Sequence, residues 1–228
     1  MAPAAPGSLV PGLFVPGWGA TAGLYSRGLP AGWEALELPS FRASGGVLGA
    51  YRRGLERDLE RRRGEPVVVA GHSLGAALAV LVAAERPELV ARLILVAPAG
   101  LPYTKSVRGA ARALAGQIVR GCYPVGELVR AGLQVAAAPR AAMRLAQDTH
   151  DLDLEAELTR LRTHAIPSTV VGCAQDELAM PSHCRRLASL LDADYREVES
   201  RDGHIWPITE PELLRRELED VTVVIPKT

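Results

Sequence analysis

The chain has 228 residues, a length that suits one α/β domain with a substantial buried core and room for an inserted subdomain. Its 26 basic and 26 acidic residues give a formal net charge of zero, which argues against a nucleic-acid partner and leaves no bias toward anionic membranes. The three cysteines lack C-x-x-C spacing, so we expect buried thiols in a reducing compartment and no disulfide framework. Because the first residues lack a signal-peptide pattern and no apolar run is long enough to span a bilayer, we expect a cytoplasmic protein without a membrane partner.

Strand-like and helix-like segments alternate along most of the chain. Short apolar or alternating runs predict strands at 13–15, 33–38, 67–70, 92–97, 167–172 and 195–199. Helical periodicity or a longer apolar run predicts helices at 51–63, 74–84, 182–191 and 211–219. This alternation predicts a mostly parallel, doubly wound sheet of about six strands. The tail at 221–225 also looks strand-like, and it could extend a sheet edge or contact a partner chain.

One long stretch, residues 102–162, interrupts the alternation. It contains no strand pattern, and it predicts short helices around 107–119, 126–137, 139–147 and 154–161. Because it lies between two predicted strands, we expect a helical cap above the carboxyl edge of the sheet. Residues 1–101 and 163–228 would then form the core, and the simpler alternative is a long crossover connection.

The most informative motif is Gly71-His72-Ser73-Leu74-Gly75, which follows a buried strand and precedes an apolar helix and matches G-x-S-x-G. A serine raised above the end of a strand needs a tight, strained turn. The helix then returns so close to the strand that only glycine fits two residues before and after the serine. The first N–H groups of this helix, from Leu74 onward, would lie where a developing oxyanion needs donors. The motif therefore predicts a nucleophile at Ser73, and an ordinary turn with a hydrogen-bonded serine is the alternative.

A serine nucleophile needs a general base and an orienting acid at the same edge of the sheet. Of the five histidines, His204 alone directly follows the last predicted strand. Asp176 follows the end of the strand before it, whereas Glu177 should face elsewhere and Asp202 is too near His204 in the chain to approach its ring. We therefore expect Ser73, Asp176 and His204 as nucleophile, acid and base, in that chain order. We assign structural, cap or helix-start positions to the other histidines, which are His72, His150, His164 and His183.

These motifs together resemble the α/β-hydrolase superfamily over residues 13–219. The residues that carry the resemblance are Gly71 to Gly75, Gly172 to Asp176, and Gly203-His204. The resemblance implies an α/β-hydrolase fold in which the backbone N–H of Trp18 joins that of Leu74 in an oxyanion hole. The chain departs from relatives at Pro16, where they usually have histidine, and in the loop 39–45. Two antiparallel strands that relatives carry first are missing or reduced here, which leaves about six.

The combined pattern predicts a serine hydrolase that cleaves small-molecule carboxylic esters through an acyl-enzyme. The abundance of Ala, Leu and Val in the expected cap suggests an aliphatic acyl chain of modest size. The same three residues could instead act on a thioester, a lactone or a carbon–carbon bond, or the capped pocket could bind a ligand with little turnover. We expect no metal and no cofactor, because the histidines and cysteines lack a recognised ligand spacing and the glycines follow no phosphate-loop pattern. The oligomeric state could be a monomer or a homodimer.

Overall fold

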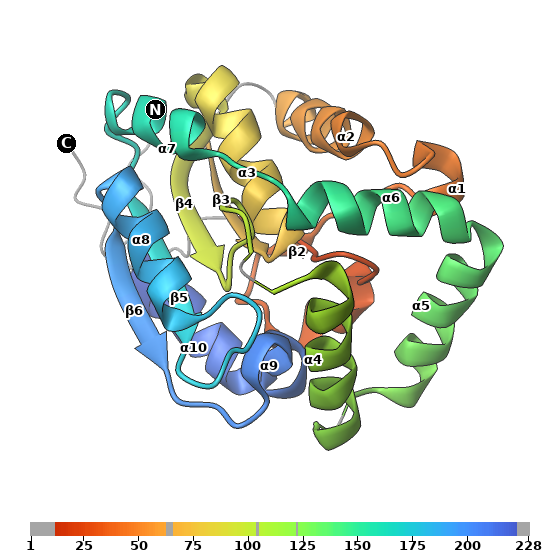
Figure 1. The fold of residues 1–228 in the computed structure, drawn as a ribbon. Coiled ribbons are helices and arrows are strands. Elements are labelled where there is room, and N and C mark those ends of the chain that lie inside the picture. The colour runs from red at the N-terminus through yellow and green to blue at the C-terminus, as the bar shows by residue number, and fades with distance from the viewer. Residues whose placement is uncertain (1–11, 63–65, 104, 122, 223–228) are drawn as a thin grey trace.

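The computed structural model describes residues 12–62, 66–103, 105–121 and 123–222. Within these residues one sheet of six strands is present, and every neighbouring pair is parallel (Figure 1). The strands, in chain order, are β1 (Gly12–Val15), β2 (Glu34–Ala35), β3 (Val67–His72), β4 (Val90–Val96), β5 (Ser168–Cys173) and β6 (Asp194–Val198). The expectation of a parallel sheet of about six strands is confirmed.

The order of the strands creates a crevice at the carboxyl end of the sheet. In space they run β2-β1-β3-β4-β5-β6, so the chain moves outward from β1 to β2 and then crosses back to β3. The loops after β1 and β3 therefore leave the sheet on either side of a topological switch point, where open α/β sheets bind ligands. The expected strand at 33–38 is much shorter than predicted. Only Glu34 and Ala35 pair with β1, and Leu36 adds a hydrogen bond to Phe14 O (2.8 Å) before the chain leaves the sheet.

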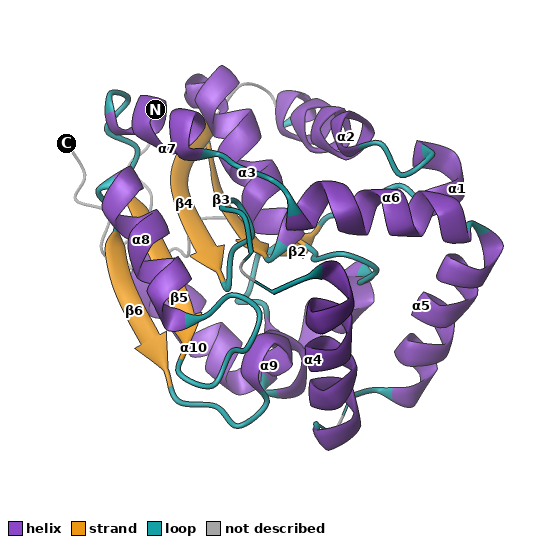
Figure 2. Cartoon of the chain, viewed as in Figure 1, coloured by secondary structure: helices purple, strands orange, loops and turns teal. Residues whose placement is uncertain are grey.

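Helices cover both faces of the sheet (Figure 2). One face packs against α2 (Leu48–Arg61), α3 (Leu74–Glu85) and α8 (Pro181–Leu191), and the other against α9 (Trp206–Thr209) and α10 (Pro211–Thr222). Alternate residues of β3 serve the two cores: Val67 and Val69 point into the first, and Val68 and Ala70 into the second. Burial on both sides explains why the central strands read as unbroken apolar runs.

The loop expected at 40–46 contains a short helix, α1 (Phe41–Ser44). Ser40 Oγ accepts a hydrogen bond from the N–H of Ala43 (3.3 Å), and Gly45 ends the helix in the left-handed conformation (φ 61°). A serine cap and a glycine stop are helix signals that are hard to recognise around a single turn. This helix brings Phe41 beneath the loop that follows β1, where its ring packs on Trp18 (ring centroids 5.3 Å apart).

Between β4 and β5 the described residues form four helices, as the sequence predicts. They are α4 (Val107–Arg120), α5 (Val125–Ala137), α6 (Pro139–His150) and α7 (Glu155–Arg162). The last of them, α7, packs against α3 and α8 in the main helical layer through Leu158 and Leu161, whereas α5 buries none of its side chains. Figure 1 shows α4 near the carboxyl ends of the strands and α5 farther from the sheet. The division into a core and a cap over a binding site remains a prediction.

The expected strand at 221–225 is wrong where the structure describes it. Val221 and Thr222 are the last residues of α10, and the rest of the segment lies outside the described residues. Leu214, Leu218 and Val221 are all buried against the sheet and recur at helical spacing, so Val221 continues an apolar helix face.

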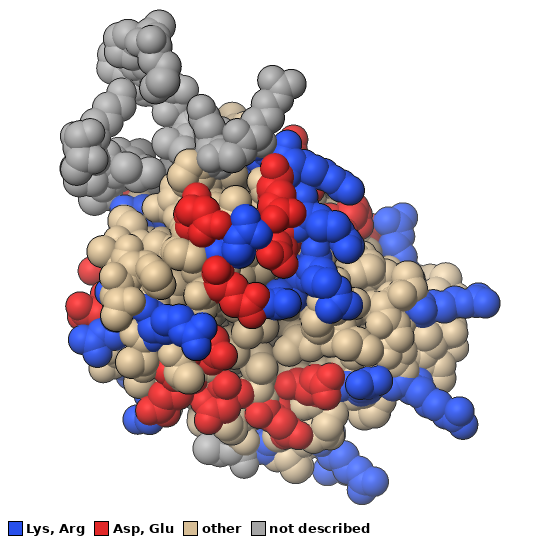
Figure 3. Space-filling view, turned by 90° about the horizontal axis from the view of Figure 1, so that it is seen from above, with Lys and Arg blue, Asp and Glu red and all other residues tan. Residues whose placement is uncertain are grey.

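Acidic and basic side chains are interspersed on the face of the molecule seen in Figure 3. The α2–α3 region has one such network, in which Arg86 pairs with Glu56 (3.1 Å), Glu60 (2.7 Å) and Glu88 (2.6 Å). These exposed pairs contribute little stability individually. No helix among the described residues combines the length and apolar character needed to cross a membrane.

Candidate active site

The turn after β3 places Ser73 in a strained backbone conformation. Its φ of 54° and ψ of −116° lie outside the regions that residues with a side chain favour. A Cβ at Gly71 would overlap the backbone of Gly75, and a Cβ at Gly75 would overlap the carbonyl oxygen of Val15. The close return of α3 past the strands therefore requires glycine at both positions, as the motif predicts.

The backbone of Ser73 is fixed while its hydroxyl stays out of the helix cap. Its N–H donates to Val96 O (3.0 Å), and its carbonyl oxygen accepts from Ala99 N–H (3.1 Å), which ties the turn to the end of β4. The side chain makes no capping hydrogen bond to α3 and is 9% exposed. Leu74 is the first residue of α3, where N–H groups lack partners within the helix. Ser73 thus stands at the positive, N-terminal end of a buried helix.

The predicted acid and base are in contact. Nδ1 of His204 lies 2.8 Å from Oδ2 of Asp176, and the two residues are only 4% and 3% exposed. The other carboxylate oxygen of Asp176 accepts the N–H groups of Leu178 (2.7 Å) and Ala179 (3.0 Å). Because a carboxylate accepts hydrogen bonds, Nδ1 of His204 carries the hydrogen and Nε2 is left to accept a proton. Asp176 is therefore oriented on both sides.

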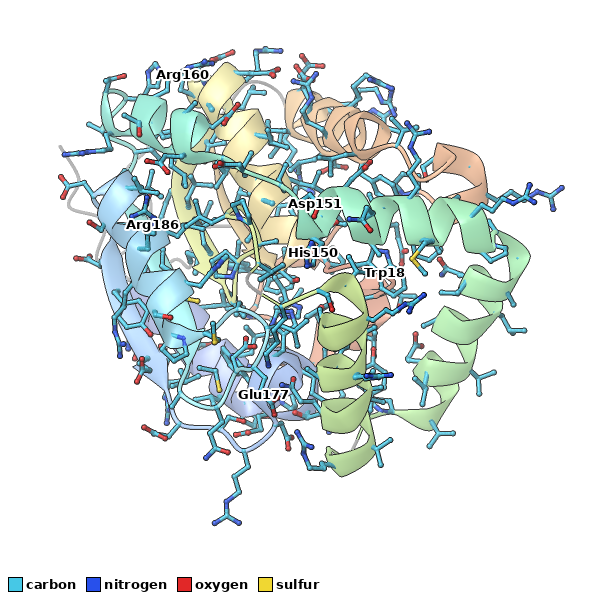
Figure 4. The ribbon with its side chains drawn as sticks, in the orientation of Figure 1. Trp18, His150, Asp151, Arg160, Glu177 and Arg186 are labelled. Atoms are coloured by element: carbon cyan, nitrogen blue, oxygen red, sulfur yellow. The ribbon has the colours of Figure 1, made fainter. Side chains whose placement is uncertain are left out.

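The neighbouring carboxylate, Glu177, points away from this pair, as expected. It forms ion pairs with Lys105 (3.4 Å) and Arg120 (3.5 Å), which belong to the segment between β4 and β5. Figure 4 labels Glu177 on the loop that follows β5.

The backbone of His204 is held by two side chains from distant elements. Its N–H donates to Oε1 of Gln117 on α4 (2.8 Å), and its carbonyl oxygen lies 3.0 Å from Nε2 of His72. The rings of His72 and His204 are 4.8 Å apart, and Nδ1 of His72 lies 2.8 Å from the hydroxyl of Tyr25. The sequence predicts a structural role for His72, and these contacts agree with it. Tyr25 and Gln117 have no motif around them that could have drawn attention.

Ser73 is next to His72 in the chain and so lies close to the His204 loop. Among the described residues, however, no hydrogen bond joins the Ser73 hydroxyl to the His204 ring. The hydroxyl is instead beside Tyr103, whose phenol has its pKa raised by burial and by the nearby Asp176, while a side-chain hydrogen bond with Ser73 lowers it. The structure therefore brings Asp176 and His204 together and places a neutral phenol at Ser73.

Tyr103 is a site residue that sequence reasoning missed. It comes from the loop after β4, and its ring stacks on His183 (centroids 5.2 Å apart, 15° between planes). The sequence predicts His183 at the start of a helix, and it lies in the first turn of α8. It is half-buried, its Nε2 lies 3.1 Å from Pro98 O, and Met180 caps α8. Burial lowers the pKa of His183, so this ring is a neutral wall beside Tyr103.

The loop after β1 lies against the serine turn. A Cβ at Gly17 would lie 3.1 Å from Nδ1 of His72 and 3.5 Å from Cβ of Ser73. The next residue, Trp18, lies below α6 (Figure 4), and its indole N–H donates to Ala142 O (3.1 Å). Trp18 and Leu74 border the same small cavity of about 30 Å³, together with Phe41. The two predicted oxyanion donors thus belong to residues that face one space.

A larger cavity of about 410 Å³ is bordered by Tyr103 and His183. Apolar side chains form part of its wall, among them Leu101, Leu178 and Met180. Charged residues also line it, and they are Lys105, Asp153, Glu155, Glu177 and Arg186. Tyr103 borders this cavity, and its phenol also interacts with Ser73.

Nothing in the described part of the chain brings three or more His, Cys, Asp or Glu side chains into a group that could hold a metal ion. Cys173 and Cys184 are buried free thiols, and burial raises the pKa of both.

Comparison with known proteins identifies the architecture. The model of the alpha/beta hydrolase family matches residues 13–217. A membrane phospholipase A described as a bacterial virulence factor has a similar structure, with a TM-score of 0.75 and 20% identity, covering 93% of this chain and 78% of that one. The enol-lactonase from Burkholderia xenovorans LB400 gives a TM-score of 0.71 and 15% identity, covering 94% of this chain and 92% of that one. The thioesterase domain from the curacin biosynthetic pathway gives 0.60 and 17%, covering 92% and 91%.

No protein of curated function matches the chain in sequence. At the identities found among solved structures, similarity establishes a shared fold and not a shared substrate.

Proposed function

The chain belongs to the alpha/beta hydrolase family, and from that premise we propose that it is a serine hydrolase cleaving carboxylic esters through an acyl-enzyme. The observation that carries the proposal is the buried contact of 2.8 Å between Asp176 and His204, beside a serine held in a strained turn. A serine nucleophile requires a base such as this histidine, in which a carboxylate holds one ring nitrogen and the other nitrogen can accept a proton.

In the proposed mechanism, Ser73 Oγ attacks the acyl carbon and transfers its proton to Nε2 of His204. Asp176 stabilises the imidazolium, and the N–H groups of Leu74 and Trp18 stabilise the oxyanion. His204 then returns the proton to the departing alcohol as the carbon–oxygen bond of the ester breaks. Water, deprotonated by His204, attacks the acyl-enzyme and releases the acid and the free serine.

Tyr103 has to move for this chemistry to begin. The phenol of Tyr103 remains protonated because burial raises its pKa. It also forms a side-chain hydrogen bond with Ser73. We propose that a bound substrate displaces this contact and lets the hydroxyl turn to His204. The helices α4 to α6 would act as a cap that excludes water from the site. We propose an aliphatic acyl group of modest size, because Ala, Leu and Val are abundant in α4 to α6.

The same residues could act on a thioester or a lactone, and two proteins of similar fold are named for such bonds. A carbon–carbon bond, or slow turnover by a ligand-binding protein, would use the same pocket. We propose a small-molecule substrate, a cytoplasmic location, and a monomer or homodimer, with neither nucleic acid nor membrane as partner.

The proposal is tested with p-nitrophenyl acyl esters of increasing chain length, together with thioesters and lactones. Changing Ser73→Ala or His204→Ala should lower turnover on the order of 10⁴- to 10⁶-fold, because members of such a triad act as a unit. Glu212→Gln, at an exposed carboxylate in the first turn of α10 that lines neither cavity, serves as a control and should retain wild-type turnover. Full ester hydrolysis by the Ser73→Ala variant would refute the assignment.

A further inference from the structure

A buried chain of hydrogen bonds connects the two loops that flank the serine. The N–H of Gly17 donates to the Tyr25 hydroxyl (3.4 Å), which lies 2.8 Å from Nδ1 of His72. Nε2 of His72 lies 3.0 Å from the carbonyl oxygen of His204. Tyr25, His72 and His204 are all buried, so water does not compete for these bonds.

The chemistry of the partners fixes the direction of every bond in this chain. The carbonyl of His204 only accepts, so Nε2 of His72 must carry a hydrogen. Burial and the neighbouring His204 lower the pKa of His72 well below its usual range, so the ring is neutral and its Nδ1 is an acceptor. The Tyr25 hydroxyl therefore donates to Nδ1 and accepts from Gly17. Burial also raises the pKa of Tyr25, which keeps that donor hydrogen in place.

This chain of hydrogen bonds ends at the backbone of His204, the proposed base, whose position must be fixed. His204 lies in a single turn of 3-10 helix (Gly203–Ile205), and its N–H is already held by Gln117. With His72 on the carbonyl as well, both polar backbone groups of residue 204 are bonded to side chains of other elements. Only the side-chain torsions of His204 then remain free, and Asp176 limits those.

We infer that Tyr25 and His72 are positioning residues, which hold the His204 backbone and the Gly17-Trp18 loop in register around Ser73. The inference deepens the proposed function and rests on it for its catalytic consequence. Neither side chain lines the smaller or the larger cavity, so substrate binding should not depend on them directly. His72 has a partner at both ring nitrogens: the His204 carbonyl fixes the tautomer, and the Tyr25 hydroxyl donates to the nitrogen left as acceptor.

The test uses Tyr25→Phe, which removes one oxygen, with His72→Leu, His72→Gln and the double variant Tyr25→Phe/His72→Leu. Tyr195→Phe is the matched control, because it removes a phenol oxygen that bonds Glu197 at the far edge of the sheet. We expect Tyr25→Phe and His72→Leu each to lower kcat about tenfold with KM nearly unchanged, the effect of one lost buried hydrogen bond. His72→Gln keeps a donor and an acceptor and should retain more activity than His72→Leu.

Two further readouts separate positioning from simple loss of packing. The double variant should be no slower than His72→Leu, because the two residues form one chain. KM for the ester should stay within about twofold of wild type in His72→Gln, since His72 lines neither cavity. Multiplied effects in the double variant, a change confined to KM, or kcat values equal to that of Tyr195→Phe would overturn the inference.

Amide hydrogen exchange tests the positioning role without relying on enzyme activity. Amide exchange in the segment 203–206 should rise about tenfold in Tyr25→Phe and in His72→Leu, and should stay at the wild-type rate in Tyr195→Phe. Unchanged exchange in that segment overturns the positioning role whatever the enzyme turns over. If wild-type protein hydrolyses no ester while exchange rises as expected, the proposed reaction fails and the positioning role stands.

Discussion

Replacing Asp176 by asparagine tests the orientation of the base with a change of one atom. Oδ1 of Asp176 accepts two backbone N–H groups, from Leu178 and Ala179, and an asparagine can keep both bonds only by placing its carbonyl oxygen there. Its NH₂ group then faces Nδ1 of His204, which in the wild type donates to Oδ2 at 2.8 Å. Two donors cannot share that contact, so the ring should change tautomer.

The wrong tautomer places a hydrogen on Nε2, the nitrogen that must accept the proton of Ser73. We therefore expect Asp176→Asn to lower kcat on the order of 10⁴-fold, the size of the effect when a triad carboxylate becomes an amide. KM should change little, because Asp176 lines neither cavity. The assay is steady-state hydrolysis of a p-nitrophenyl ester, with thermal unfolding to show that the variant folds.

Asp220→Asn is the matched control for this variant. It makes the same change at an exposed carboxylate on α10 that pairs with Arg196 (3.2 Å) and lines neither cavity, and it should leave kcat within about twofold. An Asp176→Asn enzyme that retains a tenth or more of wild-type kcat would refute the reasoning. Equal losses in the two variants would refute it as well.

Other predictions concern the turn, the buried histidine and the tyrosine at the serine. Gly75→Ala should destabilise the fold by about 3 kcal/mol or more, because the added methyl overlaps the carbonyl oxygen of Val15, and chemical denaturation measures this. The pKa of His72 is lowered below the ordinary 6.5, so its contribution to stability is full above pH 6.5 and is lost as the pH falls below it. Relative to wild type, His72→Gln should therefore flatten the decline of unfolding free energy below pH 6.5 by about 1.4 kcal/mol per pH unit, and an unchanged slope would contradict a neutral buried ring. Tyr103→Phe should speed fluorophosphonate labelling of Ser73 up to about tenfold, because the hydroxyl loses one competing hydrogen bond, and slower labelling would assign Tyr103 a different role.

The central strands and the serine turn could be predicted because their causes are local. β3 and β4 are buried on both faces, and such strands have continuous apolar sequence that is visible without a structure. Gly71 and Gly75 are required by steric contact within a few residues of Ser73 or with the adjacent strand. The positions of Asp176 and His204 followed from the rule that loops after parallel strands meet at one edge.

The residues that were missed act through contacts between distant parts of the chain. Tyr25 meets His72 across 47 positions, and Gln117 meets His204 across 87. No spacing rule relates such pairs, and Tyr103 likewise reaches Ser73 only because the loop after β4 folds back. The strand predicted at 221–225 was wrong for a different reason. A β-branched run such as the one at Val221 fits a strand pattern and an apolar helix face equally well.

The pairing of Ser73 with His204 is tested most sharply by locating a fluorophosphonate adduct by peptide mass spectrometry and measuring its rate of formation in wild-type and His204→Ala protein. We expect a single adduct on Ser73 that forms at least about 10³-fold more slowly without the His204 imidazole. An adduct on another residue, or equal labelling rates in the two proteins, would contradict that pairing.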